Sequence, residues 1–204
     1  MNDLVIVGAG GHCRSILSIL RLQKNCSILA IYDNAPRPNE YIDGIKVLHI
    51  DEILDNKCRN LFPSIGDNQR RHDAIKFLNP YSYSFPSIIS PYAYVDPSAT
   101  IGKGCFIGSF AYVGPQVHID DFSIINTHAI LEHESKVGSF VHLAPSSVVC
   151  GRTTISDFCF LGANSVVIDN LEIQKNTIIG AGSVVIRSIT AMNTTYVGNP
   201  ASSK

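Results

Sequence analysis

The chain has 204 residues, of which 45% are hydrophobic and 16% are charged, and its formal net charge is −1. This composition is typical of a globular protein, and it lacks the basic surplus with which proteins attract nucleic acid or anionic lipid. No apolar run approaches the roughly 20 residues that a membrane span needs. The N-terminus enters a strand-like segment without the features of a signal peptide, and the six cysteines form no Cys-x-x-Cys pair. We therefore expect a cytoplasmic protein with no nucleic-acid partner and no membrane span.

Residues 1–86 show strands that alternate with helices. Buried strands are expected at residues 4–7 and 28–32, and a third strand is expected to end at Ile65 and Gly66. Apolar residues at helical spacing predict a helix over residues 13–20, and residues 69–78 predict the next one. This alternation predicts an α/β domain of Rossmann-like type, with a short parallel sheet and helices on its faces.

A glycine-rich turn, Gly-Ala-Gly-Gly-His at residues 8–12, joins the first strand to the first helix. Glycines there let backbone N–H groups approach a phosphate, and the helix N-terminus adds a favourable dipole. Asp33, at the end of the second strand, and Gly66, at the end of the third, are expected beside this turn. The full dinucleotide fingerprint has a third glycine where this chain has Cys13, so we favour a nucleotide-phosphate site without NAD or redox chemistry. An NAD site and a purely structural turn remain as alternatives.

A different period begins after the proline-containing connection at residues 81–97. Every sixth residue is then Val, Ile or Leu, which is typical of a parallel β-helix and of neither an α-helix nor a flat strand. We expect residues 87–204 to form this β-helix and a C-terminal tail, without an inserted loop, and the glycines that follow several of the aliphatic residues to give the corners conformational freedom. Because such a prism leaves its flanks open, we expect a homotrimer. The aliphatic positions are Val95, Ile101, Ile107, Val113, Ile119, Ile125, Leu131, Val137, Leu143, Val149, Ile155, Leu161, Val167, Ile173, Ile179 and Val185.

The most polar part of the repeat is residues 125–134, which contains His133 between two glutamates. His133 is expected to face outward near a corner, and Glu134 could fix its tautomer and raise its basicity, as a general base requires. A solvated surface histidine is the alternative. His128 and His133 also have a spacing found in β-helical zinc carbonic anhydrases, but no third histidine stands about two coils earlier, so we expect no metal.

Taken together, these motifs resemble the bacterial 4-amino-sugar N-acetyltransferases, near relatives of sialic-acid O-acetyltransferases within the hexapeptide acyltransferases. The resemblance covers essentially the whole chain. It implies a left-handed β-helix and acetyl transfer from acetyl-CoA, as co-substrate, to a sugar attached to a nucleoside diphosphate. The motifs that carry it are GAGGH at 8–12, YDN at 32–34, IGDNQRR at 65–71, the segment 125–145 and VGNPA at 197–201.

The resemblance also implies roles for single residues. His133 matches the general base, and Glu134 matches the carboxylate that raises its basicity. Gly151 offers an N–H to the tetrahedral oxyanion. The matches to the acetyl-CoA contacts are His142, Ala163 and Ala181, and the matches to the nucleotide-sugar pocket are Gly10, Gly11, His12, Asp33, Asn34, Gly66 and Asn126. Gly10, Asn34 and Ala181 replace a serine, an acidic residue and a glycine of some relatives.

The expected acceptor is the 4-amino group of a UDP- or dTDP-linked 4-amino-4,6-dideoxy sugar, for surface polysaccharide or glycan synthesis. A histidine base suits an amine, since an amino-sugar ammonium needs to lose only one proton near neutral pH, whereas a sugar hydroxyl is far less acidic. A sialic-acid or other sugar O-acetyltransferase is the alternative, followed by a non-catalytic sugar-nucleotide-binding protein or a β-helical zinc enzyme.

Overall fold

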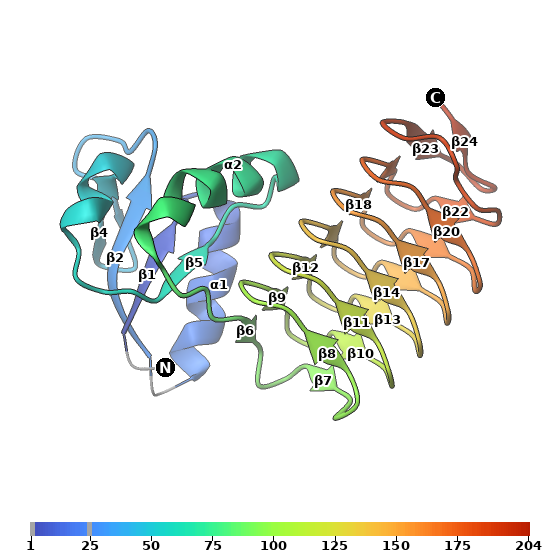
Figure 1. Cartoon of the computed structure of the whole chain (residues 1–204), viewed down its shortest axis with the longest axis horizontal. Coiled ribbons are helices and arrows are strands. Elements are labelled where there is room, and N and C mark those ends of the chain that lie inside the picture. The colour runs from blue at the N-terminus through green and yellow to red at the C-terminus, as the bar shows by residue number, and fades with distance from the viewer. Residues whose placement is uncertain (1–2, 24–25) are drawn as a thin grey trace.

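The computed structural model describes residues 3–23 and 26–204, and it shows an α/β domain beside a triangular β-helix (Figure 1). The α/β part contains a five-stranded sheet of order β3-β4-β2-β1-β5, with α1 against one face and α2 against the other. Neither of these helices is long and apolar enough to cross a membrane, within the described part of the chain. Its elements are β1 (Asp3–Val7), α1 (Gly11–Leu22), β2 (Ser27–Asp33), β3 (Tyr41–Ile42), β4 (Ile45–His49), the 3₁₀ helix η1 (Ile50–Asp55), β5 (Leu61–Pro63), α2 (Asn68–Leu78) and the 3₁₀ helix η2 (Asn79–Tyr81).

The sheet is mixed and not parallel throughout, which corrects the expectation from the sequence. Strands β1, β2, β4 and β5 run parallel, but the edge strand β3 pairs antiparallel with β4. The two strands are joined by Asp43 and Gly44, with φ of 53° and 78°. An Asp-Gly pair with positive φ at both positions favours a tight hairpin, and a hairpin places its strands antiparallel.

The β-helix runs without an inserted loop, as predicted, and the aliphatic positions from Ile107 to Val185 are all buried in its core. Three sheets form its sides, and their strands are parallel except that β24 pairs antiparallel with β23. We call them the apolar sheet (β7, β10, β13, β16, β19, β22), the polar sheet (β8, β11, β14, β17, β20) and the domain-facing sheet (β6, β9, β12, β15, β18, β21, with β23 and β24). The strands are β6 (Ile88–Ile89), β7 (Tyr94–Val95), β8 (Thr100–Ile101), β9 (Phe106–Ile107), β10 (Tyr112–Val113), β11 (His118–Ile119), β12 (Ile124–Ile125), β13 (Ile130–Leu131), β14 (Lys136–Val137), β15 (His142–Leu143), β16 (Val148–Val149), β17 (Thr154–Ile155), β18 (Phe160–Leu161), β19 (Val166–Val167), β20 (Glu172–Ile173), β21 (Ile178–Ile179), β22 (Val184–Val185), β23 (Thr195–Val197) and β24 (Ser202–Ser203).

The outward residues distinguish the three sheets. The second residue of each short strand points into the prism, so the first one points outward. On the polar sheet these outward residues include Thr100, His118, Lys136 and Glu172. On the domain-facing sheet Ile88, Phe106 and Ile124 are buried in a core shared with α1 and the N-terminal sheet. On the apolar sheet they are Tyr94, Tyr112, Ile130, Val148, Val166 and Val184.

The corners do not use their glycines as expected. Positive φ is found three residues after the aliphatic position, for example at Phe122 and Glu134, with φ of 59° and 60°. The glycine directly after the aliphatic residue is needed for close approach instead. A Cβ built at Gly108 would lie 2.7 Å from the backbone nitrogen of Thr127 on the next coil. The two coils are therefore too close for a side chain at Gly108.

Candidate functional site

His133, Glu134 and Gly151 lie together at the corner between the apolar and polar sheets. The His133 Nδ1 is 3.0 Å from the Glu134 Oε2, and the Arg152 Nε donates a hydrogen bond to that same oxygen over 3.0 Å. Glu134 and Arg152 meet because they are 18 residues apart and occupy the same corner position on successive coils. The His133 side chain is 46% exposed, so a substrate can reach it.

This geometry selects the tautomer of the His133 imidazole. Because a carboxylate only accepts hydrogen bonds, Nδ1 is the donor, and in the neutral tautomer that this contact selects the lone pair is on Nε2. The hydrogen bond from His133, together with the Arg152 guanidinium, holds the pKa of the Glu134 carboxyl below its usual range. The imidazole is thus oriented by an ionised carboxylate, an arrangement that a histidine general base requires.

Gly151 lies directly against the imidazole. A Cβ built at this glycine would be 2.6 Å from Cε1 and 2.7 Å from Nε2 of His133. Within the described chain, the Gly151 N–H makes no backbone hydrogen bond. The three residues assigned to the chemical step therefore meet at one corner.

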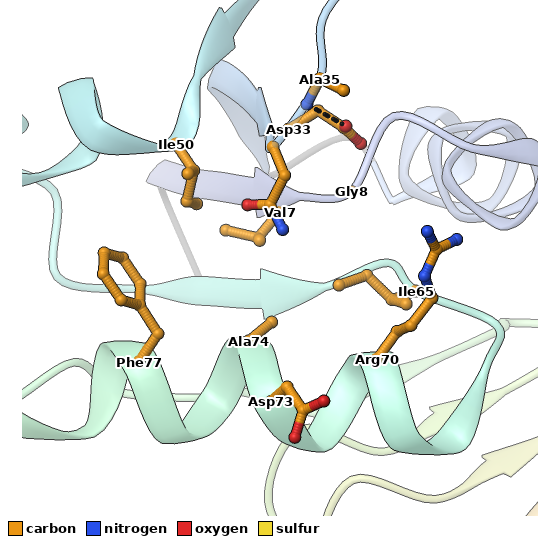
Figure 2. Close-up of a pocket in the computed structure, with 11 residues that line it drawn as sticks. Val7, Gly8, Asp33, Ala35, Ile50, Ile65, Arg70, Asp73, Ala74 and Phe77 are labelled. Carbon is orange, nitrogen blue, oxygen red and sulfur yellow. Dashed lines mark hydrogen bonds between the residues drawn. The ribbon is translucent and has the colours of Figure 1, made fainter.

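A second group consists of two residues predicted for the nucleotide sugar, Asp33 and Asn34, which line a cavity of about 530 Å³ in the N-terminal domain (Figure 2). The cavity lies at the carboxyl ends of β1 and β2, where parallel sheets bind ligands. Asp33 lies at its edge, and its carboxylate accepts hydrogen bonds from the backbone nitrogens of Ala9 and Ala35, over 2.7 and 3.0 Å. The lining residues are Val7, Gly8, Asp33, Asn34, Ala35, Ile50, Ile65, Arg70, Asp73, Ala74 and Phe77.

The glycines of the opening turn have different structural reasons. Gly8 has a φ of +106°, and a Cβ there would lie 2.7 Å from Ile65, so the fold itself needs this glycine. Gly10 and Gly11 are exposed, and a Cβ built on either would meet no heavy atom within 4 Å. Gly10 is the N-cap of α1 and gives it no side-chain cap. The first N–H groups of α1 are therefore left open to a ligand, and they favour an anion.

Several lining residues of the cavity were not identified from the sequence. Ile50 and Phe77 form apolar walls, and the Arg70 side chain extends from α2 toward the level of Gly8 (Figure 2). Arg70 lies in the IGDNQRR segment, at the start of the helix that follows the third strand. The sequence could have identified Arg70 from this placement, because the start of a helix that follows a strand lies at the ligand-binding edge of the sheet.

A third group meets at the junction between the two domains. The His142 Nδ1 donates to the Gly66 carbonyl over 3.0 Å, and its Nε2 is 3.2 Å from the Asn126 side-chain nitrogen. The His12 ring lies beside it, with ring centroids 6.3 Å apart, and makes an edge contact with Phe106. The structure thus places His142, which was assigned to acetyl-CoA, among the residues assigned to the nucleotide sugar.

Both junction histidines are neutral at physiological pH. The pKa of His142 is lowered to about 4, chiefly by burial; the Gly66 hydrogen bond opposes this shift and the nearby Arg71 adds to it. Burial, with His142 and Arg71, lowers the pKa of His12 to about 3. The His12 Nε2 is fully buried and has no hydrogen-bond partner within the described residues.

Ala163 and Ala181 form a fourth group, at the corner between the domain-facing and apolar sheets. They lie on successive coils, where the Ala163 carbonyl accepts a hydrogen bond from Gly182 over 2.8 Å. This corner is a different one from the His133 corner. One chain therefore does not bring all the predicted residues into a single site.

The described residues include no group of three or more His, Cys, Asp or Glu side chains placed to hold a metal ion. His128, which shares the zinc-type spacing with His133, lies at another corner, and its ring packs against Phe110 with centroids 5.1 Å apart. The two histidines of that spacing therefore occupy different corners of the prism.

Family models match both parts of the chain: the PglD N-terminal domain over residues 3–78 and the GMPPB C-terminal domain over residues 89–187. PerB from Caulobacter crescentus, solved in complex with CoA and GDP-perosamine, is 31% identical with a TM-score of 0.93, over 100% of this chain and 98% of that one. Related structures describe it as a perosamine N-acetyltransferase.

Two more relatives extend this comparison. The acetyltransferase domain of PglB from Neisseria gonorrhoeae, solved with acetyl coenzyme A, is 25% identical with a TM-score of 0.91, over 100% of both chains. An uncharacterized protein of Acanthamoeba polyphaga mimivirus is 31% identical over 105 residues, which are 51% of this chain and 21% of that protein. The full-length match to the perosamine enzyme confirms the resemblance found in the sequence: the chain belongs to the family of bacterial sugar N-acetyltransferases that combine a PglD-type N-terminal domain with a parallel β-helix.

Proposed function

We propose that this protein transfers the acetyl group of acetyl-CoA to an amine on a sugar linked to a nucleoside diphosphate. The observation that carries this proposal is the His133–Glu134 pair beside Gly151, in a chain that also has a cavity at the ligand-binding edge of its N-terminal sheet. PerB was solved in complex with CoA and GDP-perosamine, which supports a CoA thioester and a nucleotide-linked amino sugar as the two substrates here.

The pair accounts for the chemical step by general-base catalysis. The amine nitrogen attacks the thioester carbonyl carbon, and the His133 Nε2 takes the proton that the nitrogen loses. The carbonyl oxygen becomes an oxyanion, to which the Gly151 N–H donates. When the tetrahedral intermediate collapses, the carbon–sulfur bond breaks and the thiolate leaves as CoA, taking the proton from the imidazolium. No acyl-enzyme is formed in this scheme.

The nucleotide is assigned to the cavity of the N-terminal domain. The open N-terminus of α1 and the Arg70 guanidinium provide donors and positive charge for a diphosphate. Ile50 and Phe77 provide apolar walls for a base. The sequence favoured UDP or dTDP, and the GDP-sugar bound by PerB adds a third nucleotide to be tested.

The acceptor atom is the 4-amino group of a 4,6-dideoxy sugar in this proposal. An amino-sugar ammonium loses its proton near neutral pH, so an imidazole is a sufficient base, whereas a hydroxyl is far less acidic. Asn126 and Gly66 contact the two ring nitrogens of the same residue, His142. They are the residues assigned to the sugar end of the substrate.

We infer further that the active site forms between two chains of a homotrimer of left-handed β-helices. His133 lies at the corner opposite the domain-facing sheet, so the prism separates it from the N-terminal domain of its own chain. The apolar sheet lies between the His133 corner and the Ala163 corner. Three prisms that turn their apolar sheets toward a common axis would cover these apolar flanks, and the His133 corner of one chain would lie beside the Ala163 corner of the next.

The experiment is CoA thiol release from acetyl-CoA over a panel of UDP-, dTDP- and GDP-linked 4-amino sugars, each compared with the matching 4-hydroxy sugar and with sialic acid. Turnover with a 4-amino sugar, and mass-spectrometric detection of its N-acetyl product, supports the proposal. Acetylation of sialic acid hydroxyls alone would identify the protein as an O-acetyltransferase. Binding of nucleotide sugars without thiol release would identify it as a sugar-nucleotide-binding protein.

A further inference from the structure

Arg71 of α2 is a buried cation at the junction between the two domains. Its side chain is among the largest fully buried ones of the described residues, and the residue is 1% exposed. No carboxylate lies within ion-pair distance of it in the described part of the chain. Burial lowers the pKa of Arg71 to about 10, so it stays charged at neutral pH. A buried charge without an ion partner is costly and needs a full set of hydrogen bonds.

The guanidinium has that full set, and its acceptors come from both domains. Nε donates to the Phe122 carbonyl over 2.8 Å, and Nη2 donates to the Val141 carbonyl over 3.4 Å, both on the β-helix. Nη1 donates to the Ile65 and Gly66 carbonyls over 2.9 and 3.2 Å, and Nη2 also donates to the Asn68 side chain over 2.8 Å, all on the N-terminal domain. Five donors thus meet five acceptors.

The Gly66 carbonyl connects this guanidinium to the third group of candidate residues. It accepts hydrogen bonds from Arg71 and from the His142 Nδ1, and the other ring nitrogen of His142 faces the Asn126 amide over 3.2 Å. The orientation of Asn126 therefore depends on His142, and that of His142 depends on the turn that Arg71 holds. The exposed neighbour Arg70 makes none of these contacts.

We propose that Arg71 is a positioning residue for the acceptor: it fixes the Gly66 turn, and through it His142 and Asn126, in the arrangement that receives the amino sugar. This inference rests on the proposed function. A displacement of about 1 Å at a substrate-positioning group can cost about 100-fold in rate, so a residue that touches no substrate can still control this step. The proposal assigns His142 to the acceptor and not to acetyl-CoA, because His142 contacts Gly66 and Asn126. The remaining acetyl-CoA residues, Ala163 and Ala181, lie at the same corner as Asn126 but two and three coils further along the prism, and they make none of these contacts.

The test compares Arg71→Lys and Arg71→Met with Gln23→Ala. Gln23 provides a matched control, because its side-chain nitrogen also donates across the domain junction, to the Ile89 carbonyl over 2.6 Å, but away from the Gly66 turn. We expect KM for the nucleotide sugar to rise about tenfold or more in both Arg71 variants, while KM for acetyl-CoA changes less than about twofold. Gln23→Ala should leave both constants near wild type.

A second readout uses the histidine side chains without any substrate. In wild type, the ¹⁵N spectrum of His142 should show the neutral Nδ1–H form at pH 6. Arg71→Lys should alter this signal, because three ammonium donors cannot replace the five of the guanidinium. If both Arg71 variants fail to fold, Asn68→Ala, which removes one acceptor of the guanidinium, takes their place in both measurements.

An unchanged acceptor KM with an unchanged His142 signal would overturn the inference. Equal increases of KM for both substrates, or the same change in Gln23→Ala, would also overturn it, because they indicate only a loosened junction. If the wild-type enzyme acetylates no nucleotide sugar, the proposed function fails, and the His142 spectrum still decides whether Arg71 holds the Gly66 turn.

Discussion

The imidazole of His133 lies against the α-carbon of Gly151, one coil further along the prism, so closely that a Cβ there would be 2.7 Å from Nε2. A side chain at position 151 would therefore clash with the ring of His133 and not with the backbone. The neighbour that a methyl group would meet is a side chain that can rotate, so the methyl group would displace the ring and leave the coil intact.

The first prediction follows from this contact. Gly151→Ala should lower kcat by about tenfold or more, since a displaced base is out of line with the proton it abstracts, while the free energy of unfolding changes little. Gly138→Ala is the control, because a Cβ there would lie 2.7 Å from the backbone nitrogen of Asp157. That variant should lose stability but keep the kcat of its folded fraction. Steady-state kinetics and urea unfolding measure the two effects. Wild-type kcat in Gly151→Ala would contradict the assignment.

The second prediction concerns Arg70 and the nucleotide cavity. Arg70→Met should weaken binding of the preferred nucleoside diphosphate by about tenfold, the size expected for one charge-assisted hydrogen bond. Calorimetry at two salt concentrations measures this loss and should show a weaker salt dependence than in wild type. Arg59→Met, which removes a guanidinium stacked over the Tyr83 ring elsewhere on the same domain, should bind as wild type does. Equal affinities in all three proteins would remove the diphosphate from this cavity.

The third prediction concerns stability at acid pH. Burial lowers the folded-state pKa of His12 to about 3, below the value of 6.5 that the unfolded chain has. Between these values the unfolded chain binds the extra proton, so the neutral His12 contributes stability that is fully present above pH 6.5 and is lost as the pH falls toward 3. His12→Phe should therefore lose less stability than wild type between pH 7 and pH 4.5.

Urea unfolding at the two pH values measures that difference. His128→Gln, a substitution of an exposed histidine at a corner, is the control and should show the wild-type loss. An identical pH dependence in His12→Phe and wild type would show that His12 is not held neutral by the junction.

The fourth prediction concerns the shared active site. His133→Ala and Arg70→Glu should each be nearly inactive alone. When equal amounts of the two variants are refolded together, about a quarter of the sites should be active. In a quarter of the neighbouring pairs, the chain that contributes His133 has it intact and the chain that contributes the cavity has Arg70 intact. Thiol release measures the recovery, and separately refolded proteins mixed afterwards are the control. A mixture that stays inactive would place both residues in a site within one chain.

The sequence predicted the β-helix well, because its signal is local and repeated. Each coil buries its aliphatic residue against the same position of the next coil, so the register of residues such as Ile107 and Ile125 follows from the period alone. The positive φ at Phe122 and Glu134 could not be predicted from the sequence, since neither residue type favours it. The coil contacts impose it: the Phe122 N–H donates to the Lys103 carbonyl of the previous coil. The antiparallel edge strand had a local signal in Asp43 and Gly44 that the strand alternation concealed.

The candidate site was predicted only in parts. Residues 133 and 134 are adjacent, so their pairing could be inferred, and the period of 18 residues per coil brings Gly151 to His133. The contact between Gly66 and His142 depends on how the two domains pack, which no local pattern encodes. The same holds for the adjacent arginines at 70 and 71, because only packing decides that Arg71 is buried while Arg70 lines the cavity.

The central claim is that His133 removes the proton from a sugar amine during acetyl transfer. The most direct test is steady-state kinetics of wild type and His133→Ala, with acetyl-CoA and the preferred nucleotide-linked 4-amino sugar. The account predicts that kcat falls by about 10²–10⁴-fold in the variant, with both KM values close to wild type, since a general base acts in the transition state and not in binding. A kcat that stays at the wild-type value in His133→Ala would contradict it.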